Sequence, residues 1–202
     1  MSEFFELDGS MLDEVIAAHL VTWEKTSLSV QLGPAFLKAF YELAIEDDQT
    51  MALGIRKSSN APISSWCVGF RAYNSFNEKL KKRLGIRLHI MVLKKVMSGE
   101  ISLAQLWDHF FGTPQDRAVK NPDSHLGAFG CVGKNFEDVL LLTNLIQYTA
   151  GELCKHEPSC WAVTNETNKG GKLVMKRADF SRIDTIQAKD RTLGIYEFFP
   201  TT

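Results

Sequence analysis

The order of strand-like and helical segments is the feature that most restricts how this chain can fold. Residues 4–7 predict a short strand. Apolar residues at helical spacing follow from Leu12 and again after Gly33-Pro34, where Pro34 suits a first helical turn. Strands are then expected at 51–56 and 63–73, joined by a polar turn at 57–60. The first part of the chain is therefore predicted to run strand, helix, helix, strand, strand.

The rest of the chain continues this alternation. A helical insertion is expected at 77–111, divided near Ser98-Gly99, with a turn-rich segment at 112–124 after it. The predicted order is completed by a strand at 126–132, a helix at 136–155, a strand at 161–164, a helix at 169–178 and a hairpin of 182–189 with 193–199. Because we find no internal repeat or linker, we expect one α/β (α+β) domain spanning 1–202.

Charge and hydropathy exclude several classes of protein. The net charge is −1, so no overall field favours nucleic acid, and such a partner is not expected. We find no apolar run of about 18 residues and no charged-then-apolar leader after Met1, so no transmembrane segment is expected. The four cysteines have irregular spacing and fit reduced thiols. Together these features predict a cytoplasmic protein.

A group of metal-ligating residue types occurs at Cys154, His156 and Cys160. Structural zinc usually takes four ligands in two spaced pairs, and the sequence offers no second pair. We therefore expect no metal, and we interpret this stretch as a helix end followed by a loop.

Two blocks of sequence are similar to those of a known family. The first, 28–41, reads LSVQLGPAFLKAFY, and the second runs from Asn168 to Phe180. Both resemble the GNAT acyltransferase superfamily, in which the second block commonly begins with Asn and closes with Gly-Phe. The resemblance implies a mixed, mostly antiparallel central sheet flanked by helices, with a helical insertion after the third strand. It also implies acyl transfer from a thioester, acetyl-CoA or another acyl donor, to a small-molecule amine.

The resemblance places the diphosphate of acyl-CoA at the start of the long helix, in a glycine-rich loop. Here the loop reads Val132-Gly133-Lys134-Asn135, and Gly133 and Lys134 fit an anion cradle, with Asn135 as the helix cap. The cofactor-binding candidates are therefore Gly133, Lys134 and Asn135 of this loop, together with Asn168 at the start of the second block. Glu137 and Asp138 follow in the first turn, where their charges oppose a bound diphosphate. An ordinary capped helix is an equally good interpretation.

The catalytic features of the family are only partly present. Its general acid is a Tyr seven residues after the Asn, and this chain has Met175 there, which has no proton to donate. Asp179 stands where the family has Gly.

The resemblance implies that backbone amides of Gly130, Cys131 and Val132 hold the thioester and its pantetheine arm between the fourth and fifth strands. His125 is the nearby side chain that titrates near neutral pH, so it is the catalytic candidate; a structural role is the alternative. Cys131 as a nucleophile lacks an evident basic partner.

A basic segment lies at 78–96, inside the predicted insertion. Between its cations, apolar residues recur at helical spacing, and its single acid is Glu78. The cations lie at 79, 81, 82, 83, 87, 94 and 95. A solvated face of a packed helix is one interpretation. The other is a docking face, at 79–95, for an acidic partner such as an acyl carrier protein.

The sequence thus leaves competing functions open. The leading hypothesis is an N-acyltransferase-like protein that uses an acyl-CoA or an acyl carrier protein as donor. The alternative is a catalytically inactive GNAT-like binding module that acts through a partner or ligand. A weaker third possibility is another reaction on the same fold.

Overall fold

The computed structural model describes residues 4–25, 27–99, 124–133, 135–187 and 192–200. Lys134, the predicted insertion beyond residue 99 and the turn-rich segment up to residue 123 lie outside the described residues.

A seven-stranded sheet in the described part of the chain forms the centre of the molecule, in the order β1-β2-β3-β4-β5-β7-β6. The strands are β1 (Phe5–Glu6), β2 (Thr50–Arg56), β3 (Ile63–Phe70), β4 (His125–Cys131), β5 (Cys160–Asn165), β6 (Phe180–Gln187) and β7 (Thr192–Phe198). Neighbouring strands are antiparallel except β4 and β5, which are parallel. The predicted mixed, mostly antiparallel sheet is confirmed.

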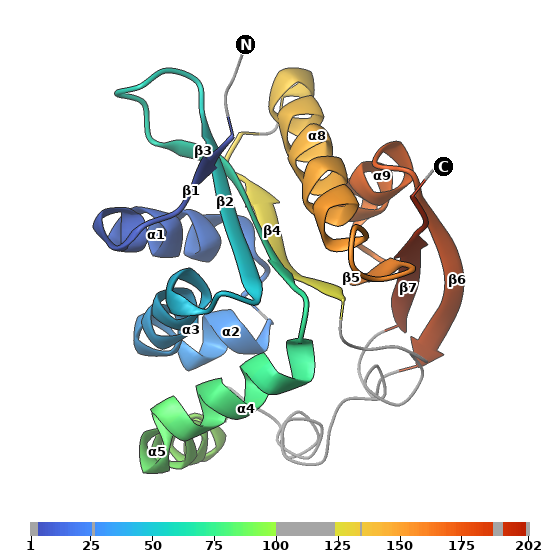
Figure 1. Cartoon of the computed structure of the whole chain (residues 1–202). Coiled ribbons are helices and arrows are strands. Elements are labelled where there is room, and N and C mark those ends of the chain that lie inside the picture. The colour runs from blue at the N-terminus through green and yellow to red at the C-terminus, as the bar shows by residue number, and fades with distance from the viewer. Residues whose placement is uncertain (1–3, 26, 100–123, 134, 188–191, 201–202) are drawn as a thin grey trace.

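Helices cover both faces of this sheet (Figure 1). One side carries α1 (Leu12–Thr22), which follows a 3-10 turn at Gly9–Met11, and then α2 (Leu28–Leu32) and α3 (Pro34–Glu46). Next to them lie α4 (Tyr73–Leu84) and α5 (Ile86–Met97). The other side carries α8 (Phe136–Leu153) and α9 (Lys169–Arg177).

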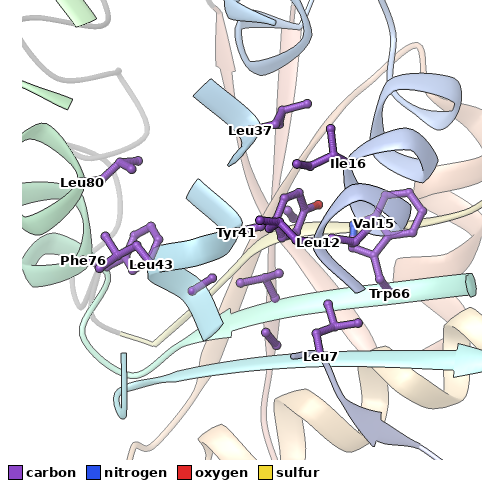
Figure 2. Close-up of a cluster of buried hydrophobic side chains, with 14 of the residues drawn as sticks. Leu7, Leu12, Val15, Ile16, Leu37, Tyr41, Leu43, Trp66, Phe76 and Leu80 are labelled. Carbon is purple, nitrogen blue, oxygen red and sulfur yellow. The ribbon is translucent and has the colours of Figure 1, made fainter. Parts of the chain in front are cut away.

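The two layers of helices enclose separate apolar clusters. Trp66 from β3 packs in the first cluster with side chains of α1 and α3 such as Val15, Leu37 and Tyr41 (Figure 2). The second lies between the sheet and α8–α9, where Leu145 and Ile146 are fully buried. The two clusters hold the helices against opposite faces of β3 and β4.

The insertion after the third strand is confirmed for the described residues, but its boundaries differ from the prediction. The strand β3 ends at Phe70, not at residue 73, and α4 begins at Tyr73, before the predicted start of the insertion at residue 77. The helical segment ends at Met97, next to the break predicted near Ser98-Gly99, where Gly99 has a φ of 74°. A second break, which was not predicted, divides the segment at Gly85, whose φ of 50° is a left-handed conformation that favours glycine. The basic segment is therefore two helices. The short helix α2 was not expected.

Among the described residues, none of the helices has the length and hydropathy that a membrane span requires.

Candidate functional site

The sheet opens between β4 and β5. These strands pair only through His125 with Trp161 and Leu126 with Ala162, whereas β3 pairs with β4 as far as Cys131. Beyond Leu126 the two strands separate, and β5 continues along β7 on its other side. The divergence of the fourth and fifth strands, which the resemblance implies, is therefore present.

The residues of β4 after Leu126, which we call its open end, are held by the C-terminal end of α1. The indole Nε1 of Trp23 donates to the carbonyl oxygen of Phe129 at 3.1 Å, and Thr22 Oγ1 donates to that of Cys131 at 3.4 Å. Gly130, which lies between these residues, leaves room for the α1 contact, since a Cβ there would lie 2.7 Å from the Trp66 ring and 3.0 Å from the Thr22 methyl. Two carbonyls of β4 beyond its pairing with β5 are thus bonded to the last residue of α1 and to the residue after it.

A buried polar group supports this end of α1. The ring of His19 lies 4.6 Å from that of Trp23, and its nitrogens contact Tyr41 Oη at 2.8 Å and Ser29 Oγ at 3.1 Å. Burial lowers the pKa of His19 to about 4, so the imidazole is neutral at pH 7. The group is a scaffold that fixes Trp23 against β4.

The amides of β4 divide between the two sides of the strand. Val132 N donates to the carbonyl of Ser64 at 2.9 Å, so this amide is used within the sheet. Because alternate residues of a strand direct their N–H groups to opposite edges, Phe129 and Cys131 direct theirs toward the β5 side. Of the three residues predicted to hold the thioester, Cys131 alone has this orientation, because Gly130 faces β3 like Val132. Phe129 was not predicted.

The start of α8 is filled by a carboxylate from its own first turn. Asp138 is only 1% exposed, and its Oδ1 lies 2.6 Å from Nζ of Lys57, which comes from the β2–β3 turn. A Cβ on Gly133 would lie 1.7 Å from Asp138 Oδ2, so only glycine leaves room for this side chain. The hydrogen bond with Asp138 raises the pKa of Lys57. The acid that was expected at a free helix terminus is buried and ion-paired.

The predicted helix cap at Asn135 is present, and Asn168 also caps a helix, which was not predicted. Asn135 Oδ1 accepts a hydrogen bond from Asp138 N at 2.9 Å at the start of α8. Asn168 Oδ1 accepts one from Gly171 N at 2.8 Å at the start of α9. Both Asn side chains are therefore used in capping, and their roles in cofactor binding stay predictions. The same holds for Gly133, while Lys134 lies outside the described residues.

His125 lies at the other end of β4, where the strands are paired. Its ring is stacked among Trp161 at 3.9 Å, Tyr73 at 4.4 Å and Phe70 at 6.4 Å between centroids. Burial lowers its pKa to about 3. This environment favours a role in packing, because a base with so low a pKa holds a proton poorly at neutral pH. A catalytic role for His125 stays a prediction.

The positions of the family's acid and glycine have structural roles here. Met175 is fully buried in the cluster beneath α8. Asp179 has a φ of 61°, the left-handed conformation that explains the family's glycine, and its carboxylate accepts a hydrogen bond from Gln147 Nε2 at 2.6 Å. The chain tolerates this conformation because Asp adopts it more readily than most residues.

The cysteines are free thiols. Cys131 Sγ donates to the carbonyl of Gly133 at 3.2 Å, and burial raises its pKa, which disfavours the nucleophilic thiolate. Within the described ranges, we find no group of three or more residues able to hold a metal ion.

Most of the cations of α4 are paired within the molecule. Lys79 Nζ lies 2.9 Å from Asp47 Oδ2, and Arg83 binds Glu42 and Glu46 of α3 at 3.1 and 2.6 Å. The predicted basic face is therefore less positive than its sequence indicates. The carrier protein predicted to dock there stays a prediction.

Sequence reasoning missed Lys57, Thr22 and Trp23. Lys57 lies in a polar turn that carries no motif, and its partner is distant in sequence. Trp23 follows the last residue of α1, where an apolar residue next to helical periodicity indicates only packing.

No family model and no curated protein matches this chain. Solved structures do share its fold. The ribosomal-protein-S18-alanine N-acetyltransferase of Escherichia coli aligns with a TM-score of 0.55 and 9% identity, over 100% of this chain and 96% of its own. A GNAT family acetyltransferase of Bacillus cereus gives 0.53 and 11%, over 100% and 99%. An N-acetyltransferase of Staphylococcus aureus gives 0.57 and 8%, over 98% of each chain. The chain therefore has the GNAT fold.

Proposed function

We propose that this protein is an N-acyltransferase that holds its thioester donor by the pantetheine arm, between β4 and β5, without recognising a diphosphate. The amides of Phe129 and Cys131 would polarise the thioester carbonyl. The open end of β4 supports this proposal, because its amides are directed toward the side that β5 has left. The donor is acetyl-CoA, another acyl-CoA or an acyl carrier protein, and the acceptor is a small amine.

The observation that carries the proposal is the buried carboxylate of Asp138, which is paired with the exposed Lys57. The resemblance places a diphosphate at the start of this helix, where free amides and the helix dipole attract anions. Here the first turn of the helix carries the buried carboxylate of Asp138, and Lys57 already has its counter-charge. A second anion would face Asp138 at close range, which is unfavourable in a partly desolvated site.

The reaction would need few side chains. The amine nitrogen attacks the thioester carbon, the C–N bond forms, and the C–S bond breaks with release of a thiolate. The amine loses its proton to water, and the thiolate takes one from water, because Met175 cannot donate. Absence of a general acid typically costs about 10²–10⁴-fold in rate, so a slow enzyme is expected.

Calorimetric titration with acetyl-CoA and with S-acetyl-pantetheine tests the proposal. The wild-type protein should bind both with similar affinity, because the nucleotide part adds nothing. Asp138→Ala removes the opposing negative charge and leaves Lys57 without its partner, so it should bind acetyl-CoA about 10-fold more tightly and leave S-acetyl-pantetheine unchanged.

Glu137→Ala is the matched control, since Glu137 lies in the same helical turn but is exposed. It should change acetyl-CoA binding by less than about 2-fold. Equal gains from both variants would show that overall charge, not the filled position, sets the affinity, and the proposal would fail.

The second candidate function is an inactive binding module, and the buried Met175 at the acid position favours it. This candidate predicts binding of S-acetyl-pantetheine without turnover. Incubation of acetyl-CoA with a panel of primary amines, with free thiol measured over hours, separates it from a slow enzyme.

A further inference from the structure

The outer face of α5 carries large apolar side chains that the core does not use. Ile86, Ile90, Leu93 and Met97 are 75%, 47%, 59% and 79% exposed. The same helix buries Leu88 and Val92 on its inner side. Figure 1 shows α5 at the edge of the molecule, far from the open end of β4. The exposed face is therefore an addition to the fold and lies apart from the candidate acyl-transfer site.

The spacing of these side chains is that of a helix-pairing seam. The four positions follow one another at intervals of four, three and four residues, which is the d-a-d-a pattern of a coiled coil. At 100° per residue they fall within an arc of about 60°. A helix that lies on a membrane usually presents a broader apolar face with aromatic residues, and α5 contains none. The narrow arc fits another helix.

The charges beside the seam are all positive. Arg87 and Lys94 follow the seam residues Ile86 and Leu93, at the flanking e positions, and α5 contains no acid. None of the described residues forms an ion pair with Arg87 or Lys94. Lys79 and Arg83 of α4, in contrast, are bonded to acids of the same chain. Arg87 and Lys94 therefore keep their charges for a partner.

We propose that α5 is a docking site for a partner protein that presents an amphipathic helix, with an apolar seam flanked by Glu or Asp. A second copy of this chain fits poorly, because two α5 helices would bring cations together with no acid to offset them. A helix of 12 residues is about 18 Å long, so the contact is small and suits a transient complex. The proposal does not depend on acyl transfer.

Fluorescence anisotropy of a labelled synthetic helix, titrated with the full chain at low salt, tests this proposal. One peptide carries Leu at its a and d positions and Glu at e and g, so that its own charges oppose self-pairing. The matched peptide carries Lys in place of Glu. The wild-type chain should bind the Glu peptide at least about 10-fold more tightly than the Lys peptide.

Charge and seam variants decide the outcome. The double variant Arg87→Glu/Lys94→Glu should reverse the preference, and Leu93→Asn should weaken binding of both peptides about 10-fold. Lys25→Glu, an exposed cation on another surface, is the control and should change neither. Circular dichroism shows that each variant is folded.

Three results would overturn the proposal. One is equal binding of both peptides by the wild-type chain. Another is a wild-type dimer in sedimentation equilibrium that Leu93→Asn dissociates, which would assign the face to a second copy. The third is co-sedimentation with phosphatidylglycerol vesicles, lost in Leu93→Asn, without peptide binding, which would assign it to a lipid surface.

Discussion

The two ends of β4 differ in how they are paired with neighbouring strands and in what packs against them. At its start the strand is paired on both sides, and His125 is packed among aromatic rings. At its end the strand is paired on one side only, and Trp23, which follows α1, donates to the carbonyl of Phe129 there. The first end has the features of a core, with a histidine whose pKa is lowered by burial. The second has backbone groups directed away from the sheet.

The backbone arrangement of β4 and the side chains around it therefore have to be considered separately. The divergence of β4 and β5 is a property of the backbone, and it is present although the family's acid and diphosphate loop are not. Side chains at the open end have instead formed contacts of their own, as Asp138 and Lys57 show. Changes at the paired end should therefore alter stability alone, and changes at the open end should also alter ligand binding.

The largest expected effect is a loss of folding stability at low pH, which His125 causes at the paired end of β4. The pKa of His125 is about 3 in the folded chain and near 6.5 when unfolded, so below pH 6.5 the unfolded chain binds a proton that the folded chain does not. Stability is therefore fully present above pH 6.5 and is lost as the pH falls toward 3. Between pH 7 and about pH 4.5, His125 alone should cost about 3 kcal/mol.

Urea unfolding of the wild type and of His125→Phe at both pH values measures this cost. The variant should lose about 3 kcal/mol less than the wild type over this range, while His19 contributes equally to both. An unchanged loss would show that the His125 site is open to water, and the contrast between the two ends of β4 would disappear.

The next effect concerns Gly133 at the open end. Gly133→Ala places a Cβ against the Asp138 carboxylate and should destabilise the chain by about 2 kcal/mol. Thermal unfolding of Gly133→Ala, Asp138→Ala and the double variant measures the coupling, and the double variant should recover most of the loss.

Gly151→Ala is the control, because nothing lies within 4 Å of a Cβ at this helical position. It should stabilise the chain by up to about 1 kcal/mol. Additive effects of Gly133→Ala and Asp138→Ala would mean that the two groups are not in contact.

A smaller effect is expected at the α1 contact. Trp23→Phe keeps an aromatic ring but removes the donor to the Phe129 carbonyl, which should cost about 1 kcal/mol. It should also weaken S-acetyl-pantetheine binding, because the open end of β4 loses a support. A stability loss with unchanged binding would separate α1 from the ligand site.

Local sequence signals predicted the cap of α8, the hairpin and the order of elements. Asn135 caps its helix as expected, because capping depends on residues within one turn, and Asn168 caps α9 in the same way although this was not predicted. The break at Gly85 was missed because apolar residues keep their helical period through it. The pairing of Lys57 with Asp138 was not predictable, since it depends on how a turn and a helix distant in sequence meet across the sheet.

The most direct test is the ratio of the affinities for S-acetyl-pantetheine and acetyl-CoA, measured by calorimetry on the wild-type chain. A ratio near 1 is expected if the arm is held at the open end of β4 and Asp138 opposes a diphosphate at the start of α8. Acetyl-CoA binding about 10-fold or more tighter than S-acetyl-pantetheine would mean that the nucleotide is recognised and would contradict the account. Absence of binding by either compound would contradict it as well.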